Sequence, residues 1–200
     1  MTAALELRGV GISRGGRRLF SELSLTLAQG EACAVTGANG AGKTSLLRAV
    51  AGLLSIDEGE IAFGGLEPAA ARAQGIHYLG HHDGLKPART ALEEFSFWTR
   101  WDDASAAMIA LAMASLELEP LFPLEVRRLS AGQRRRLALG RLVAASRPLW
   151  LLDEPTGPLD AEWRVRFANL MAMHLETGGT VLAAVHDPLP GATRSLEIAP

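Results

Sequence analysis

Residues 32–50 constrain the fold more than any other part of the chain, and their sequence is "ACAVTGANGAGKTSLLRAV". A continuous apolar run ends in a glycine, and a glycine-rich turn follows. The residues after the turn place apolar side chains at helical spacing. A buried strand, a glycine turn and an amphipathic helix form the start of a parallel α/β unit. The sequence therefore predicts an α/β fold.

The turn "GANGAGKT" fits the pattern G-x-x-x-x-G-K-[ST], which is typical of a phosphate-binding loop. Glycines let backbone amides converge on phosphates, and the start of the helix adds positive charge. Lys43 is expected to reach the β- and γ-phosphates, and the Thr44 hydroxyl to bind Mg²⁺. Lys43 is one of only two lysines in the chain, and its compact ammonium suits such a loop better than a planar guanidinium. The loop residues expected to bind nucleotide are Gly37, Ala38, Asn39, Gly40, Ala41, Gly42, Lys43 and Thr44.

Two acids follow the apolar run at 149–152, which suits a buried central strand. Asp153 is expected to reach Mg²⁺ through water. If the strand persists, the Glu154 side chain would point to the opposite face of the sheet from Asp153. It could orient and deprotonate the water that attacks a γ-phosphate. The alternative is a pair of acids that only caps a strand end. His186 ends another apolar strand, at the edge where α/β sheets bind ligands, and is expected to contact the γ-phosphate or the attacking water.

The remaining pattern divides the chain into a core and an inserted lobe. Residues 5–10 alternate apolar and charged side chains, which suggests an edge strand, and 22–28 alternate in the same way after a Gly- and Arg-rich turn at 14–20. Segments 59–65 and 75–80 are short strands. Three helical segments follow with no strand between them. We expect one domain, 1–200, with an α/β core at 1–86 and 148–200 and a helical lobe at about 87–147.

Composition excludes several classes of protein. A net charge of −2 creates no general attraction to nucleic acid, and a single cysteine, Cys33, allows no internal disulfide. The N-terminus has no signal-peptide pattern, and the longest uncharged stretch, 104–116, is too short to span a bilayer. We expect a cytosolic chain, or one attached to a membrane only through a partner.

The segment "LSAGQ" at 129–133 places a serine before a basic helix, where Ser130 would be an ordinary N-cap. Together with "GANGAGKT", "LWLLDEP", "PTGPLD" and His186, in this order and spacing, it resembles the ATP-binding subunits of ABC transporters over nearly the whole chain. The resemblance implies a P-loop NTPase fold, with a RecA-like core, an antiparallel β subdomain and an inserted α-helical lobe. It also implies an ATPase that uses ATP and Mg²⁺.

In that family two cassettes pair head to tail, so the resemblance implies a homodimer in which Ser130, Gly132 and Gln133 bind the ATP held by the other copy. It makes Glu154 and His186 catalytic and places Asp160 in the D-loop beside the nucleotide. The five arginines around this segment are expected to form a solvated helix face with salt bridges, rather than to meet lipid phosphates. They are Arg127, Arg128, Arg134, Arg135 and Arg136.

The sequence departs from the family pattern at several positions. Arg14 stands where an aromatic residue usually stacks on adenine, and its guanidinium plane could stack instead. His81, or His82 if the register slips by one, replaces the usual glutamine near Mg²⁺ and the lytic water. Ala131 replaces a glycine of the signature, and Pro158 stiffens the D-loop.

Within the family, the chain is similar to the ATP-binding subunits of haem exporters in cytochrome c maturation. The features are its short length, "RGGRRLF", "YLGHHDGLK" and the segment from "SAGQRRRLALGRL" to "LLDEPTGPLD". This implies integral membrane partners of a Ccm-type complex and a peripheral location at the cytoplasmic face of the bacterial inner membrane. ATP hydrolysis would drive haem export or release of a haem-loaded chaperone. The alternatives are another small exporter, or a non-transport ATPase of the family in DNA repair or translation.

Overall fold

The computed structural model describes residues 3–145 and 147–198. The chain forms two compact units. The α/β unit comprises Met1–Tyr78, Arg147–Glu154 and Met171–Pro200, and the helical unit comprises Leu79–Ser146 and Pro155–Leu170. The helical unit thus includes 79–86 and 155–170, which the sequence pattern placed in the core. Contacts within the unit explain this: Arg166 pairs with Glu117 at 2.6 Å, and the Arg136 guanidinium lies 4.1 Å from the Trp163 ring.

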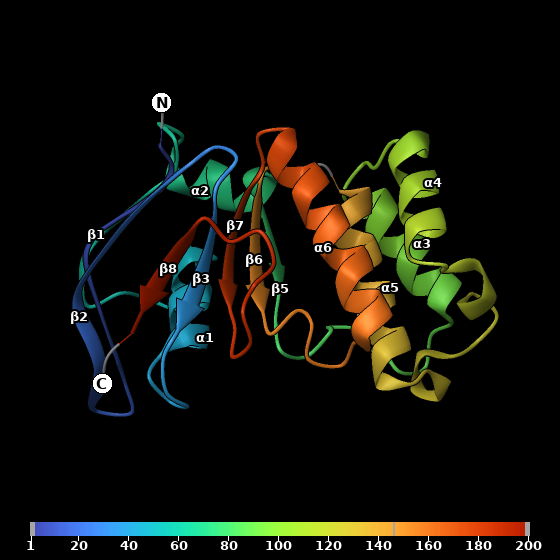
Figure 1. Cartoon of the computed structure of the whole chain (residues 1–200), viewed down its shortest axis with the longest axis horizontal. Coiled ribbons are helices and arrows are strands. Elements are labelled where there is room, and N and C mark those ends of the chain that lie inside the picture. Colours follow the sequence, from blue (N-terminus) through green and yellow to red (C-terminus); the bar gives the residue numbers. More distant parts are fainter. Residues whose placement is uncertain (1–2, 146, 199–200) are drawn as a thin grey trace. The chain divides into compact units, whose positions relative to one another are not determined.

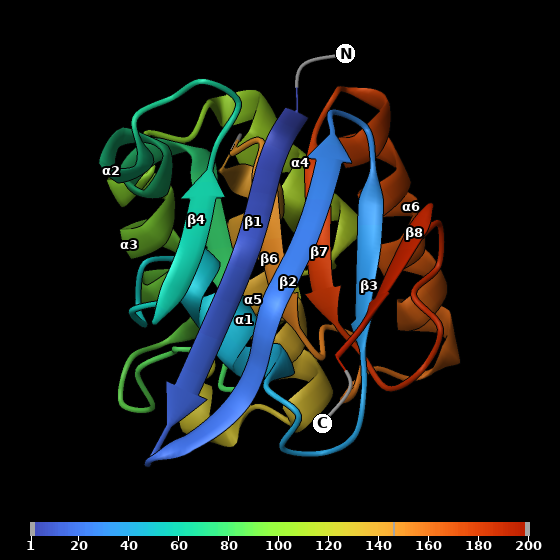
Figure 2. The ribbon, with the colours of Figure 1, turned by 90° about the vertical axis from the view of Figure 1, so that its left-hand side faces the viewer.

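The α/β unit begins with an antiparallel sheet. Its strands, in the order β2-β1-β4, are Arg17–Ala28, Ala3–Arg14 and Glu58–Ala62. Figure 2 shows β1 between β4 and β2, so the predicted edge strand is in fact the central one. The predicted turn at 14–20 is also shorter than expected. Only Gly15 and Gly16 form it, with φ of 59° and 77°, as a tight two-residue hairpin turn requires.

A five-stranded sheet completes this unit. Its order is β5-β6-β7-β3-β8, with bounds Ile76–Leu79, Leu149–Asp153, Thr180–Ala184, Ala32–Thr36 and Arg194–Glu197. The strands β6, β7 and β3 pair in parallel and are buried almost throughout, which their apolar runs predict. Helix α1 (Lys43–Val50) lies between the two sheets in Figures 1 and 2, and buries Leu46 and Leu47 in the shared core. A short helical turn, α2 (Pro68–Ala70, continued by Ala71–Gly75), precedes β5.

The helical unit contains α3 (Ala91–Trp101), α4 (Ala106–Ser115) and α5 (Ala131–Ala144), together with the first part of α6 (Ala161–Glu176). Short 3₁₀ turns occupy Glu119–Leu121 and Val126–Arg128. Each of the first three helices begins with a hydroxyl that accepts from a backbone amide, as an N-cap does: Thr90, Ser105 and Ser130. The three predicted helical segments are therefore confirmed.

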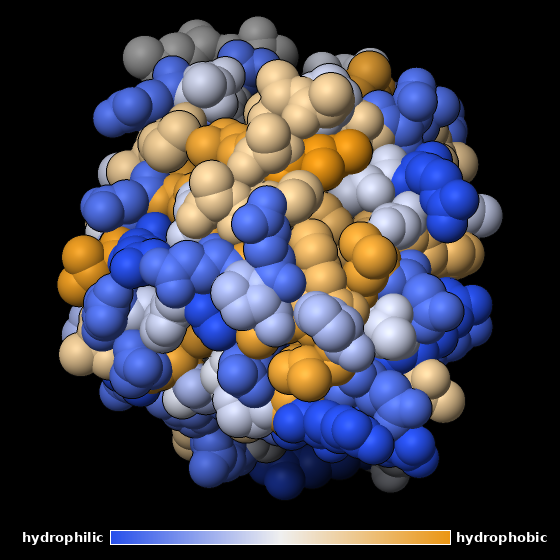
Figure 3. Space-filling view, turned by 90° about the vertical axis from the view of Figure 1, so that its right-hand side faces the viewer, coloured by the Kyte–Doolittle hydropathy of each residue, from blue (hydrophilic) through white to orange (hydrophobic). Residues whose placement is uncertain are grey.

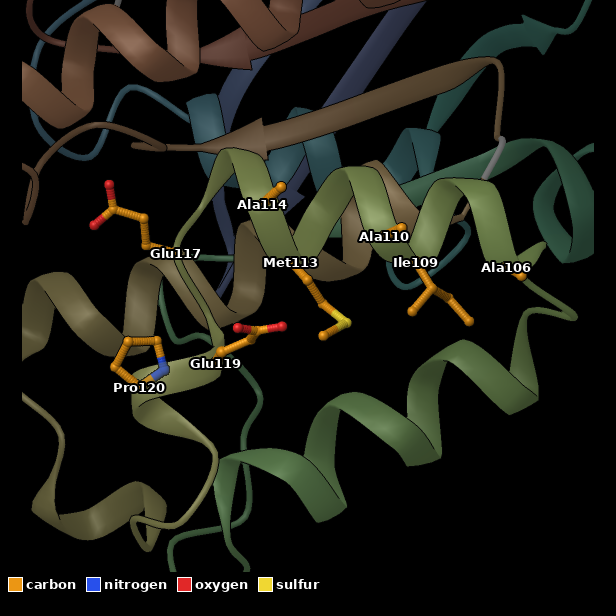
Figure 4. Close-up of a pocket in the computed structure, with 8 residues that line it drawn as sticks. All are labelled: Ala106, Ile109, Ala110, Met113, Ala114, Glu117, Glu119 and Pro120. Atoms are coloured by element: carbon orange, nitrogen blue, oxygen red, sulfur yellow. The ribbon is translucent and has the colours of Figure 1, made fainter.

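Helix α4 is unusual because it has no charged residue, yet only Ala112 in it is buried. Figure 3, in which the helical unit faces the viewer, shows hydrophobic side chains gathered at the surface. In Figure 4, Ile109 and Met113 lie on one side of α4, with Glu117 and Glu119 beyond its last turn. Within residues 3–145 and 147–198, every helix lacks the length and apolar character that a bilayer crossing requires.

Candidate active site

The phosphate loop joins the end of β3 to the start of α1, and two of its glycines are structurally required. Gly37 has φ of 136°, and a Cβ there would lie 2.5 Å from the carbonyl oxygen of Ile198. Gly42 precedes α1 with φ of 114°, and a Cβ there would lie 2.8 Å from the Phe20 ring. Any other residue at these positions would meet both backbone strain and a steric clash.

The two polar residues at the start of α1 are held in place by different contacts. Lys43 is only 8% exposed, and its ammonium donates to the carbonyl oxygens of Gly37 at 2.7 Å and Ala38 at 3.2 Å. These bonds keep the charge inside the loop. The Thr44 hydroxyl donates to the Asp153 carboxylate, 3.1 Å from Oδ1 and 3.0 Å from Oδ2. Asp153 is 2% exposed at the end of β6, so two motifs 109 residues apart in sequence meet here.

The Thr44 and Asp153 oxygens are hard donors of the kind that Mg²⁺ prefers. They fit the predicted ion, because a hydroxyl and a carboxylate already lie within hydrogen-bond distance beside the phosphate loop. Among the described residues, no group of three His, Cys, Asp or Glu side chains could hold a metal ion. A magnesium ion here would therefore take most of its ligands from phosphate and water, as is usual for this ion.

Glu154 and His186 form a second pair at the same sheet edge. Glu154 Oε1 lies 3.1 Å from His186 Nε2, and both side chains are partly exposed. Strand β6 ends at Asp153 and does not continue through Glu154. The alternation of side chains along a strand, which was considered from the sequence, therefore does not decide where the Glu154 side chain points. Glu154 instead has φ of 49°, a left-handed conformation rare for a residue with a side chain, and its amide donates to Ala184 O at 2.9 Å.

These groups line one open hollow of about 440 Å³. Its lining residues are Arg14, Leu19, Asn39, Gly40, Gly42, Lys43, Thr44, Ser45, Asp153, Glu154 and His186. All but Leu19 and Ser45 are predicted site residues. The side chain of Ala41 packs in the core instead. Leu19 lies where the β1–β2 register shifts, between the pairs Ile12–Phe20 and Ser13–Arg18. A bulge of this kind re-aims a side chain, and the sequence carries no signal for it.

The other predicted site residues belong to the helical unit. Ser130 caps α5 in a capping box: its hydroxyl accepts from the Gln133 amide at 3.1 Å, and Gln133 Oε1 accepts from the Ser130 amide at 2.8 Å. The N-cap interpretation of Ser130 is therefore confirmed. A Cβ on Gly132 would lie 3.2 Å from Pro158 O, so the signature turn is close to the D-loop. Asp160 caps α6 by accepting from the Trp163 amide at 3.0 Å.

His81 is exposed on a short loop, Gly80–Asp83, which we call the His81 loop. Its ring meets that of His82 edge to face at 5.5 Å. Arg135, 2% exposed, binds the loop: its guanidinium donates to Gly80 O at 3.3 Å and His81 O at 3.4 Å, and lies 3.2 Å from Asp83 Oδ1. The predicted solvated arginine face is therefore wrong for Arg135, because this guanidinium points into the unit.

A second arginine of α5 also faces inward. Arg141 donates to Asp83 O at 3.2 Å, and its guanidinium lies 3.7 Å from the centre of the Trp98 ring. Burial lowers the pKa of Arg141 to about 10. Burial also raises the pKa of Asp83, although the surrounding arginines oppose that change. By contrast, Arg127 and Arg128 are exposed and near Glu125, as the sequence predicts.

Comparisons with known proteins agree with this geometry. The ABC transporter family model matches residues 20–157. The chain is 47% identical to the cytochrome c biogenesis ATP-binding export protein CcmA of Nitrobacter winogradskyi, over 97% of this chain and 98% of that protein. It is 50% identical to the protein of the same name from Rhodopseudomonas palustris, over 96% of each.

Solved structures show the same fold. A protein from Pyrococcus furiosus named "Putative ABC transporter (ATP-binding protein)" superposes with a TM-score of 0.85 at 20% identity, covering 97% of this chain and 96% of that one. A dimeric ATP-binding cassette bound to ADP and Pi superposes with a TM-score of 0.78 at 25% identity, covering 92% and 88%. Motifs, fold and relatives agree, and the chain belongs to the ABC transporter family.

Proposed function

We propose that this protein is the ATP-hydrolysing subunit of a cytochrome c biogenesis exporter, in which hydrolysis drives haem export or release of a haem-loaded chaperone. One observation carries the ATPase function: a single hollow contains Lys43, the Thr44–Asp153 pair and the Glu154–His186 pair. The export role rests on near full-length relatives that are named cytochrome c biogenesis ATP-binding export proteins.

The triphosphate of ATP would lie along residues 37–44, with its γ-phosphate toward Glu154 and His186. Loop amides and the start of α1 would bind the phosphate oxygens, and the Lys43 ammonium would exchange its carbonyl partners for phosphate. Thr44 and Asp153 would hold Mg²⁺, which supplies charge neutralisation at the phosphates. Positioning and electrostatics account for most of the catalysis of phosphoryl transfer.

Glu154 would accept a proton from the attacking water while the water oxygen bonds to the γ-phosphorus. The bond from that phosphorus to the bridging oxygen then breaks, which releases ADP and phosphate. His186 is 3.1 Å from the Glu154 carboxylate and can both orient it and contact the γ-phosphate. The left-handed backbone of Glu154 supports this assignment, because such strain concentrates at functional sites.

A second copy of the chain would complete the site. Ser130 is exposed at the positive end of the 14-residue helix α5, where it can meet an anion. We assign Ser130, Gly132 and Gln133 to the γ-phosphate held by the other copy, with Asp160 beside it, in a head-to-tail homodimer. The dimeric solved cassettes support an assembly of two copies.

Attachment to a membrane would require integral membrane subunits of a Ccm-type complex, at the cytoplasmic face of the bacterial inner membrane. Aromatic side chains on α3 offer a contact surface of suitable chemistry. Trp101 is 70% exposed and stacks on Phe97, with ring centres 6.2 Å apart. Exposed aromatic side chains of this kind are frequent anchors at protein interfaces.

Replacing Glu154 by Gln tests the function. The variant should bind Mg-ATP as the natural protein does, while hydrolysis falls by at least about 100-fold because the general base is lost. Cells that carry only this variant should fail to assemble cytochrome c. Glu176→Gln, at the exposed end of α6, is the matched control and should behave as the natural protein does. Undiminished hydrolysis in Glu154→Gln would overturn the mechanism, and normal cytochrome c assembly would overturn the export role.

A further inference from the structure

The signature turn and the D-loop lie beside each other in the helical unit, but each belongs to a different helix. Ser130 caps α5 and Asp160 caps α6, so each turn is tied to its own helix. A Cβ on Gly132 would lie 3.2 Å from Pro158 O, which shows how closely the two turns approach. Because both turns are assigned to the triphosphate of a second copy, their relative position depends on the contacts that join α5 to α6.

Trp163, in the first turn of α6, contacts both sides of this junction. Its amide donates to Asp160 Oδ1 at 3.0 Å, so its backbone holds the end of the D-loop. The Arg136 guanidinium of α5 lies over its ring, 4.1 Å from the ring centre, and that of Arg166 lies 4.5 Å from the same centre. The face of an indole ring attracts a guanidinium electrostatically. One tryptophan thus joins the D-loop to the helix that carries the signature turn.

Two guanidiniums beside one ring repel each other, and the Glu117 carboxylate offsets this repulsion. It lies 2.6 Å from Arg166 and 3.9 Å from Arg136. The Arg136 side chain is only 13% exposed, and burial lowers its pKa, whereas the charges of Glu117 and Asp160 oppose that change. Arg136 therefore keeps the positive charge that its contact with the ring requires.

Glu117 holds this carboxylate from a strained backbone position. It follows the last turn of α4 (Figure 4) with φ of 48°, the left-handed conformation in which helices commonly end and which glycine adopts most readily. A glutamate here carries a conformational cost that glycine would avoid. Such strain concentrates where a side chain has a function, and the contacts with Arg136 and Arg166 provide one.

We propose that Trp163 is a positioning residue for the ATP site that two copies share. Its contacts with Arg136 and Arg166 fix the signature turn and the D-loop as one surface, which fits the triphosphate held by a second copy. Trp163 acts through Ser130 and Asp160, and not on the ATP that its own copy binds. This inference rests on the proposed head-to-tail homodimer.

Sedimentation of the full-length Glu154→Gln protein with saturating Mg-ATP tests the proposal, because its dimer should persist without hydrolysis. Trp163→Leu in that background keeps apolar bulk but has no ring face, and should raise the dimer dissociation constant at least about fivefold. Trp163→Phe keeps a ring face and should stay within about twofold of its parent. ATP binding to dilute, monomeric protein should be the same in all three.

Phe63→Leu is the matched control, because it removes another ring that an arginine contacts, Arg72 at 5.6 Å, within the α/β unit. It should leave the dimer dissociation constant unchanged, whatever stability it loses in urea. Arg166→Gln removes one guanidinium at a position where the side chain is 35% exposed. It should weaken dimerisation at least about twofold, and it tests the same contact if Trp163→Leu does not fold.

The positioning role and the homodimer would fail in different ways. Undiminished dimerisation in Trp163→Leu or in Arg166→Gln would overturn the positioning role and leave the homodimer intact. Equal weakening by Phe63→Leu would also overturn it, because a general loss of stability would then be the cause. Weaker ATP binding by monomeric Trp163→Leu would overturn it as well, since Trp163 would then act on its own copy. If the Glu154→Gln parent stays monomeric at saturating Mg-ATP, the proposed homodimer itself fails.

Discussion

The phosphate loop and the His81 loop occupy comparable places in the sequence pattern, each after a strand, yet they are held by opposite means. The phosphate loop is fixed by its own residues: glycine conformations, and a lysine bonded to carbonyls five and six residues earlier. The His81 loop is fixed by buried arginines that come 54 to 58 residues later. A loop that is held by its own backbone and neighbouring residues is encoded locally in the sequence. A loop that is held by buried charged side chains from elsewhere in the chain depends on tertiary structure.

The two loops should also fail differently when altered. A substitution in the phosphate loop should abolish nucleotide binding with little effect on the free energy of unfolding, unless the new side chain is forced against the β1–β2 hairpin. Damage to the arginines leaves Asp83 partly buried without its partner, which is a stability problem for the whole helical unit.

The largest effect on stability should come from Arg135→Ala. Removing one partner of a fully buried ion pair costs about 3 kcal/mol or more, and the cost here should approach about 3 kcal/mol, because Arg135 is buried and Asp83 would remain partly buried without its partner. Urea denaturation followed by far-ultraviolet circular dichroism would measure it. Arg127→Ala removes an exposed pair with Glu125 and should cost less than about 1 kcal/mol. Equal losses in the two variants would mean that the buried pair does not hold the His81 loop.

Gly42→Ala should come next, with a stability loss of about 2 kcal/mol from strain and the clash with Phe20, and with nucleotide binding abolished. Gly40→Ala is the matched control, because it introduces backbone strain without a steric clash. Gly40 also has positive φ, at 80°, but a Cβ there meets nothing within 4 Å. It should lose only about 1 kcal/mol. Thermal melts and nucleotide titration of both variants would show whether close packing, beyond backbone conformation, matters at Gly42.

The α/β unit should lose stability as pH falls, because it contains a partly buried histidine, His174. His174 stacks on Trp150 with ring centres 3.8 Å apart, and burial lowers its pKa below 6.5. Between the lowered pKa and 6.5 the unfolded chain binds more protons than the folded one, so stability declines as pH falls through that window. Melting at pH 7.5 and 5.5 should show the loss, and His174→Phe should reduce it. An unchanged pH dependence in His174→Phe would exclude this histidine as the cause.

Glu154→Gly should produce the smallest effect, and of opposite sign. Glycine adopts φ of 49° without a side-chain penalty, so the variant should gain about 1 kcal/mol of stability while losing hydrolysis. Calorimetry of the natural protein and of Glu154→Gly would measure this difference in the free energy of unfolding. A loss of stability would show that Glu154 contributes more through its contacts than it costs through its backbone.

The predictable parts of this molecule are those with local causes. Apolar runs that end at Gly37, Asp153 and His186 predicted β3, β6 and β7, and Ser130 ahead of a basic helix predicted the cap of α5. Because parallel strands present their carboxyl ends at one edge, the gathering of Lys43, Asp153 and His186 also followed from sequence.

Other features could not be predicted because their causes lie far along the chain. The central place of β1 depends on β4 pairing with its far side. Leu19 enters the hollow through a register shift, and Glu154 leaves the strand through a left-handed residue. Arg135 looks like any residue of a basic helix until Asp83 and the His81 loop fold against it.

We expect that one copy of the chain holds ATP and that a second copy completes the site. Sedimentation of the Glu154→Gln protein with and without Mg-ATP tests it most directly, alongside the same protein carrying Ser130→Arg. We predict a monomer without nucleotide and a dimer with it, and a Ser130→Arg form that still binds ATP but stays monomeric. A Glu154→Gln protein that remains monomeric at saturating ATP, or a Ser130→Arg form that dimerises equally well, would show that a second copy does not complete the site through Ser130.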